Sequence, residues 1–355
     1  MAELGFDVLG VDVDEAKIKM LSDGQVPFYE PDLEPMLAHH VATGRLRFTT
    51  SFAEAAEFGD VHFVCVGTPQ RVDGLAADLS HVDSAVEALA THLSRPCLVV
   101  GKSTVPVGTA ARLLETLQRV APAAEGVSLA WNPEFLREGF AVNDTLHPDR
   151  LVFGVVRDED VNTLRDVYAS AVDAGCPVVV TDFATAELVK VAANSFLATK
   201  ISFINAMAEL CEATGADVTL LADAIGYDER IGRKFLNAGL GFGGGCLPKD
   251  IRAFMARAGE LGVDQALSFL REVDAINMRR RVRMVDLARE VCGGSISGRR
   301  VAVLGAAFKP ESDDIRDSPA LNVANQMHLQ GAVVSVTDPE AMPNARRAWP
   351  DLRFV

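Results

Sequence analysis

The sequence lacks paired cysteines and long apolar runs. Its six cysteines lie far apart in the 355 residues, with no CxxC pair and no His/Cys spacing of a zinc site, so we expect neither a disulfide framework nor a bound metal. No apolar run approaches the roughly 18 residues that span a bilayer, and the first residues lack the basic and apolar segments of a signal peptide. We therefore expect a cytoplasmic protein without a membrane partner.

Positive charge is also scarce, because 34 Lys and Arg stand against 49 Asp and Glu, for a net charge of −15. This balance argues against nucleic acid or an anionic membrane surface as partner, and an anionic ligand would need local cations. The length and the 49% of hydrophobic residues are typical of an enzyme of two or three domains.

Short β-branched runs alternate with helical patterns in the first half of the chain, which predicts a parallel α/β sheet. The runs are Phe6–Val11, Val61–Val66, Cys97–Gly101, Leu151–Val156 and Pro177–Thr181. Asp12 ends the first run. In a Rossmann fold, an acid at the end of the second strand binds the adenosine ribose hydroxyls and favours NAD over its 2′-phosphorylated relative.

The position of Asp12 predicts a truncated chain. A GxGxxG turn is expected some 20 residues before such an acid, yet only eleven residues precede it, and residues 1–5 resemble the last turn of a helix with Gly5 as its cap. Residues 300–338 predict one β-α-β half of a second Rossmann-like unit, and the sequence ends at Val355. We expect three domains (1–182, 183–293 and 294–355), with the first strand and glycine-rich turn missing, the last domain partial and NAD binding therefore weak.

Residues 241–250 set one thiol, Cys246, among four glycines and follow it with Lys249 and Asp250. Glycines let a backbone approach a bound substrate, and a nearby cation favours the reactive thiolate. The alternative is a glycine-rich loop that carries an inert cysteine.

A helix predicted from Ala184 to about Glu212 is apolar on nearly every face between Leu188 and Phe203, so it should be buried within the protein or at a subunit interface. Lys190 and Asn194 lie one turn apart on it. A lysine in such surroundings needs a partner or a task, although it can also extend its amine to the surface.

Two predicted strands are followed by polar loops, Lys102–Thr109 and Asn132–Gly139. Ligands of open α/β sheets bind at the carboxyl ends of strands, where these loops would lie. Each loop alone is equally consistent with a capped turn.

Taken together, these segments resemble the UDP-glucose 6-dehydrogenase branch of the UDP-glucose/GDP-mannose dehydrogenase family, almost letter for letter over residues 241–250. The resemblance extends over the whole chain through Val66–Pro69, Arg230–Gly232 and Phe308–Pro310 with Arg316. It implies a Rossmann-like NAD-binding domain, a central helical dimerisation region and a second nucleotide-binding domain. It also implies a homodimer that acts on UDP-glucose.

The implied reaction is a four-electron oxidation of the sugar at C6 to a carboxylate, with two NAD molecules used in turn. Cys246 would attack the intermediate aldehyde, and oxidation of the thiohemiacetal would give a thioester. Lys190 would act as base or stabilise the alkoxide, with Asn194 as a second donor. Thr104, Glu134 and Asp250 would hold the hydrolytic water, with either carboxylate as base.

The resemblance also assigns binding roles. The residues implied for the cofactor are Asp12, Lys17, Gly67, Thr68, Pro69, Thr104, Glu138, Lys249 and Arg316. Those implied for the substrate are Glu134, Phe135, Leu136, Arg137, Lys190, Asn194, Arg230, Phe235, Asn237, Gly241, Gly243 and Lys309.

The sugar is specified by the start of the cysteine segment. Gly241–Gly244 resembles the UDP-glucose branch, whereas GDP-mannose dehydrogenases tend to replace the first glycine, and Gly245 departs from the serine usual in the UDP-glucose branch. The alternatives are a GDP-mannose 6-dehydrogenase and an inactive truncated remnant that retains the dimer core.

Overall fold

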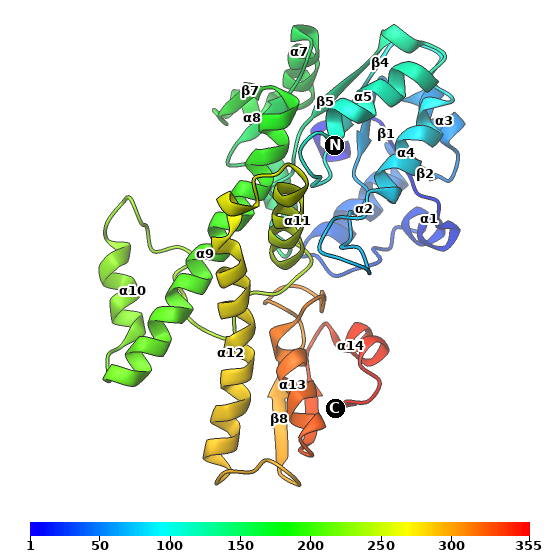
Figure 1. Cartoon of the computed structure of the whole chain (residues 1–355). Coiled ribbons are helices and arrows are strands. Elements are labelled where there is room, and N and C mark those ends of the chain that lie inside the picture. Colours follow the sequence, from blue (N-terminus) through cyan, green and yellow to red (C-terminus); the bar gives the residue numbers. More distant parts are fainter. The chain divides into compact units, whose positions relative to one another are not determined.

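The structure is a computed structural model that describes residues 1–355 in two units, Met1–Val191 and Ala192–Val355 (Figure 1). The first unit is an α/β domain, and the second combines helices with a small sheet. The helix α9 (Phe183–Thr214) begins in the first unit and continues into the second.

Two sheets form the first unit, and their strands include the five runs predicted from the sequence. The strands Leu46–Thr49 and Val127–Trp131 are additional to those runs. One sheet pairs β1 (Val8–Val11) with β2 (Leu46–Thr49), and the other has the order β3-β4-β5-β6-β7. The strands of this second sheet are β3 Val61–Val64, β4 Cys97–Gly101, β5 Val127–Trp131, β6 Leu151–Gly154 and β7 Val178–Thr181. Neighbours pair in parallel except β5 and β6, which meet antiparallel at Trp131 and Gly154. The expectation of a purely parallel sheet was therefore wrong at this one pair.

The helices of the first unit connect these strands. They are α1 Glu15–Ser22, α2 Leu33–Ala42, α3 Phe52–Phe58, α4 Ser80–Ala90, α5 Thr109–Val120, α6 Ala141–Leu146, α7 Asp158–Val167 and α8 Ala169–Asp173. Short 3-10 turns cover Ala2–Leu4 and Ala124–Gly126. Gly5 caps the first of these turns in the left-handed conformation, at φ 99°, as its place after Leu4 predicted.

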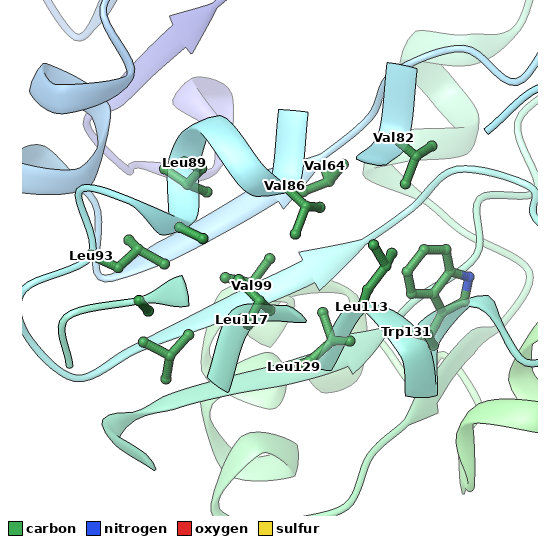
Figure 2. Packing of buried hydrophobic residues seen from close by; sticks show 14 of the residues in the cluster. Val64, Val82, Val86, Leu89, Leu93, Val99, Leu113, Leu117, Leu129 and Trp131 are labelled. Atoms are coloured by element: carbon green, nitrogen blue, oxygen red, sulfur yellow. The ribbon is translucent and has the colours of Figure 1, made fainter. Parts of the chain in front are cut away.

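The central strands β4, β5 and β6 are buried on both faces of the sheet. Alternate side chains of each strand point to opposite sides, so each strand contributes to two packed layers. One face packs Val99, Leu129 and Trp131 against helices α4 and α5, and Figure 2 shows this layer. The other face packs Leu98, Val100 and Phe153 against α7 and α8. Burial on both faces explains why these strands are continuous apolar runs, which is typical of parallel sheets.

The second unit combines helices with the three-stranded parallel sheet β10-β9-β8. Its elements after α9 are α10 Val218–Gly226, α11 Leu247–Glu260, a 3-10 turn Asp264–Leu267, α12 Phe269–Val291, β8 Arg300–Leu304, α13 Pro319–Leu329, β9 Val333–Thr337, α14 Met342–Ala348 and β10 Arg353–Phe354. Ser318 accepts from the Leu321 amide at the start of α13, and Pro319 occupies its first turn, as helix-start chemistry favours.

The expected fold class is confirmed. The described elements run from Ala2 to Phe354. The helix α9, the strands β8 and β9 and the helix α13 between them fall where the sequence predicted them. None of the helices has the length and apolar character needed to cross a membrane.

The sheet contains one buried histidine that affects stability at low pH. His62 of β3 is 8% exposed, and its Nε2 atom has no hydrogen-bond partner. Burial, helped by the nearby Arg95 guanidinium, lowers the pKa of His62 to about 4 from its ordinary value of 6.5. The folded state therefore keeps the ring neutral at pH values where the unfolded chain protonates it.

We expect the unfolding midpoint to fall as the pH drops from 6.5 towards 4, with His62 contributing a loss on the order of 3 kcal/mol. The stability is fully present above pH 6.5 because the ring is then neutral in both states. His62→Gln removes this titration, so its urea midpoint should depend less on pH across that window than that of the unaltered protein. The exposed His92 supplies the control, since His92→Gln should leave the dependence unchanged. An equally steep dependence in His62→Gln would contradict this origin.

Candidate active site

Three loops leave the same edge of the five-stranded sheet, because β3, β4 and β5 run parallel. They are the segments 65–69, 102–108 and 132–139, as the sequence predicted. Hydrogen bonds tie the first two together: Thr68 Oγ1 donates to the Thr104 carbonyl at 2.8 Å, and Ser103 Oγ donates to the Val66 carbonyl at 2.7 Å. Gly67 and Pro69, which the resemblance assigns to the cofactor, flank Thr68 in the sequence.

A buried ion pair lies beside these loops. Lys190 of α9 is 5% exposed, and its Nζ atom lies 3.0 Å from Glu134 Oε1. The ammonium also lies 5.5 Å from the centre of the Phe135 ring, and Glu134 Oε2 accepts from the Leu136 amide at 2.7 Å. The amine of Lys190 does not reach the surface, so the alternative of an extended surface lysine was wrong. The pair joins two residues that the sequence analysis singled out separately.

Sequence reasoning missed Glu187, which lies one turn before Lys190 and is 2% exposed. Its carboxylate accepts from the backbone amides of Gly108 and Ala110, both at 2.7 Å. These amides lie at the start of α5, where a helix leaves its N–H groups unpaired and favours negative charge. The first turns of α9 are thereby fixed to the end of the loop that carries Thr104.

Glu30 binds the backbone of the third loop in the same way, and the sequence analysis also missed it. Its carboxylate, 7% exposed, accepts from the amides of Gly139 and Ala141, again both at 2.7 Å. The loop therefore has a fixed end beyond the implied substrate residues Arg137 and Glu138. In the sequence, Glu30 is simply an acid between Tyr29 and Pro31. This local pattern does not reveal a hydrogen-bond partner 109 positions later.

The start of the third loop is held by a polar cluster formed by Lys102, Asn132 and Tyr168. Asn132 is 1% exposed, donates to the Val152 carbonyl at 3.0 Å and accepts from Tyr168 Oη at 2.7 Å. Lys102 Nζ reaches Asn132 Oδ1 at 3.0 Å and Tyr168 Oη at 3.2 Å. Because every member is bonded, the cluster fixes the turn that presents Glu134.

The predicted adenosine-binding acid lies where expected, at the end of β1. Asp12 Oδ2 accepts from Lys17 Nζ at 2.7 Å. Burial works against ionisation of Asp12, but hydrogen bonds from Lys17 and from the Asp14 amide outweigh it and lower the pKa of the carboxyl group. An ionised carboxylate that is partly exposed is suited to accept hydrogen bonds from ribose hydroxyls, so the residues here fit an NAD adenosine.

In the second unit, Cys246 is exposed and caps the amino terminus of α11. Helix amino termini favour thiolate over thiol. Lys249, which we expected to act on the thiol, donates to Asp250 Oδ1 at 2.6 Å. Asn194 Nδ2 donates to the other oxygen of Asp250 at 2.7 Å, and Asp250 is 2% exposed. The carboxylate of Asp250 thus accepts hydrogen bonds from both Asn194 and Lys249.

Two arginines implied for ligand binding form hydrogen bonds with nearby acids. Arg230 contacts Asp228 through several hydrogen bonds of 2.6–3.2 Å, and Arg316 contacts Asp314 in the same manner at 2.7–3.0 Å. Three further expected residues have local contacts: Arg137 bonds to Asp144, Asn237 accepts from Arg233, and Lys309 lies 5.6 Å from the centre of the Phe308 ring. Phe235 adopts a positive φ of 67° and is 39% exposed, and Leu136 is 40% exposed.

Comparison with known proteins assigns the family. Residues 1–172 match the NAD binding domain of the UDP-glucose/GDP-mannose dehydrogenase family, residues 184–279 its central domain and residues 302–355 its UDP binding domain. The UDP-glucose 6-dehydrogenase of Rhizobium meliloti (strain 1021) is 45% identical over 348 residues, which are 98% of this chain and 79% of that protein. The chain belongs to the UDP-glucose/GDP-mannose dehydrogenase family. The resemblance and the NAD cofactor expected from the sequence are both confirmed.

Solved structures of the family agree. A UDP-glucose dehydrogenase from the hyperthermophilic archaeon Pyrobaculum islandicum is 41% identical, with a TM-score of 0.94 over 100% of this chain and 81% of that one. A GDP-mannose dehydrogenase from Pseudomonas aeruginosa is 28% identical, with a TM-score of 0.62 over 100% of this chain and 83% of that one. The expectation of a nucleotide-sugar dehydrogenase is confirmed at the level of the family.

Proposed function

We propose that this chain oxidises UDP-glucose at C6 to UDP-glucuronate in two NAD-dependent steps, through covalent adducts of Cys246. The observation that carries the choice of sugar is the greater similarity to UDP-glucose dehydrogenases, at 41–45% identity, than to GDP-mannose dehydrogenase, at 28%. Two groups of residues support the chemistry. One is the buried pair of Lys190 and Glu134, and the other joins Asn194 to Lys249 and Asp250, which follow Cys246 in the sequence.

The first oxidation requires loss of the C6 hydroxyl proton as hydride leaves the carbon. Bound NAD accepts the hydride in this oxidation and in the next. Lys190 is our candidate for the group that takes this proton or stabilises the developing alkoxide, because its amine is buried and lies 3.0 Å from the Glu134 carboxylate. Asn194 supplies a neutral donor, fixed by Asp250.

The second oxidation begins when the Cys246 thiolate bonds to the aldehyde carbon and the carbonyl oxygen takes up a proton. Loss of hydride from this thiohemiacetal gives a thioester, and water then cleaves the C–S bond to release carboxylate and thiol. The sum is one alcohol, two NAD⁺ and one water giving one carboxylate, two NADH and three protons. We propose Thr104, Glu134 and Asp250 as the groups that order the water.

The binding roles follow the same proposal. NAD would contact Asp12, Lys17, the segment 67–69, Thr104, Glu138, Lys249 and Arg316. The nucleotide sugar would contact Glu134–Arg137, Lys190, Asn194, Arg230, Phe235, Asn237, Gly241, Gly243 and Lys309. We retain the domain division 1–182, 183–293 and 294–355 and a reducing, cytoplasmic location, because the mechanism needs a free thiol.

We further propose a homodimer formed along α9. Phe196, Phe203 and Leu210 lie seven residues apart, so they share one face of the helix, and they are 65%, 47% and 58% exposed. The opposite face buries Val191, Ala198 and Asn205, which are also seven residues apart. Of the two sequence-based alternatives for this helix, burial within the chain does not account for the exposed stripe. A second copy of the same helix would cover it.

Our first functional prediction concerns stoichiometry. The purified chain with UDP-glucose should yield two NADH per uronic acid, measured by absorbance and sugar analysis, whereas GDP-mannose should yield none. Cys246→Ser should largely abolish acid formation, because a serine hydroxyl is a far weaker nucleophile at neutral pH. Cys292→Ser, which alters a half-buried cysteine outside the proposed site, should keep the activity. Undiminished acid formation by Cys246→Ser would exclude the covalent route.

Lys190→Ala should lower kcat by roughly a hundredfold or more with a smaller effect on KM, given acid–base contributions of about 10² to 10⁴. Asn194→Ala should show the same pattern more mildly. The control is Lys19→Ala, which removes an exposed lysine paired with Asp23 and should leave both constants unchanged. Near-normal turnover of Lys190→Ala would make the lysine structural.

Phe203→Glu should convert the dimer to a monomer in sedimentation or light scattering, because it places a charge in the centre of the proposed interface. Leu329→Glu, at an exposed apolar position of α13, is the matched control and should remain dimeric. An unaltered protein that is monomeric at micromolar concentration, or a Phe203→Glu dimer, would refute this interface.

A further inference from the structure

A side chain of α12 forms hydrogen bonds with the backbone of the segment before Cys246. Asn277 is fully buried and makes two hydrogen bonds to one residue: its Oδ1 accepts from the Phe242 amide at 2.6 Å, and its Nδ2 donates to the Phe242 carbonyl at 3.0 Å. Both backbone groups of Phe242 are thereby satisfied by one side chain. An asparagine amide is the residue type that can supply donor and acceptor together at this spacing.

Arg281, one turn further along α12, bonds to the same segment and also to Asp317. It is 1% exposed, donates from Nη2 to the same Phe242 carbonyl at 3.1 Å, and donates from Nη1 to Asp317 Oδ1 at 2.7 Å. Nη2 also reaches the Asp317 carbonyl at 3.3 Å. Asp317 has a positive φ of 47°, a conformation that a non-glycine residue keeps only where its surroundings hold it.

The glycines before Cys246 pack against protein in this arrangement. Gly241 has φ 95°, and a Cβ atom there would collide with Asn277 Oδ1. A Cβ atom at Gly243 would collide with the Asp317 carbonyl, and the Gly244 amide donates to the Arg316 carbonyl at 2.8 Å. Close approach to α12 and to the turn at 316–317 therefore requires glycine at these positions.

We propose that Asn277 and Arg281 are positioning residues for the reactive thiol. They fix the segment 241–245 between α12 and the turn at Arg316 and Asp317, so that Cys246 stays at the amino terminus of α11. A helix amino terminus favours negative charge only within its first turn, so a small displacement of the thiolate weakens this effect. Both residues act through the Phe242 backbone.

This inference rests on the proposed function, because that function makes Cys246 the nucleophile. Its test nevertheless includes a readout without turnover: the rate at which iodoacetamide alkylates Cys246 at pH 7, followed by peptide mass analysis in the full-length protein. Cys97, a half-buried cysteine of β4, supplies an internal reference in the same digest.

Asn277→Ala should lower the alkylation rate of Cys246 relative to Cys97 by about threefold or more, because the thiolate loses its fixed place at the helix terminus. The same variant should lower kcat at least about tenfold with an unchanged KM for NAD. Arg281→Lys should show both effects more weakly, since it keeps the charge but not the forked contacts. Arg289→Ala, which removes a half-buried arginine of α12 paired with Asp286, should change neither rate.

Asn277→Asp covers the case in which Asn277→Ala does not fold, because it keeps the size and the acceptor but loses the donor to the Phe242 carbonyl. An alkylation rate that is unchanged or faster in folded variants would overturn the proposal. A slower alkylation in a protein whose unaltered form does not oxidise UDP-glucose would support the positioning role and refute the proposed function.

Discussion

The buried carboxylate of Glu187 is the contact on which the arrangement of the first unit depends. A carboxylate removed from water is costly unless hydrogen bonds compensate for its lost hydration, and two backbone amides at the start of α5 supply them here. The amides are equally in need of acceptors, because the first turn of a helix leaves them unpaired. The carboxylate and the two amides thus satisfy each other's hydrogen-bonding groups, and the first turns of α9 are fixed to the loop after β4. Lys190, one turn along, is brought to Glu134 by the same constraint.

Glu30 repeats this arrangement at the loop after β5, with the same pair of distances. The loop also has a fixed beginning in Asn132, which Lys102 and Tyr168 hold. Glu134 and Phe135 therefore extend from a segment that is anchored at both ends. Fixed geometry of this kind lowers the entropic cost of bringing reacting groups together, so the buried glutamates matter to chemistry without touching a substrate.

The sequence predicted several strands well because burial on both faces leaves continuous apolar runs, as in Cys97–Gly101. It also placed Lys190, Asn194 and Cys246 on or beside the correct helices. It did not reveal Glu30 or Tyr168, because their partners lie 109 and 36 positions away and no local pattern encodes such a distance. The role of the glycines before Cys246 was also missed, since a glycine that faces α12 has the same sequence signature as one that faces a ligand.

The pairing of cations with local acids links the charge of the chain to ligand binding. The pattern Asp-x-Arg, at Asp228 with Arg230 and at Asp314 with Arg316, gives each guanidinium a carboxylate two residues earlier. These arginine side chains are 89% and 65% exposed, so each pair contributes little free energy and opens at small cost. A carboxylate and a phosphate present similar paired oxygens to an arginine, and the phosphate carries more charge. Under the binding roles proposed above, these arginines would keep an ordered position in the acidic chain and exchange their carboxylate for a diphosphate when a ligand binds.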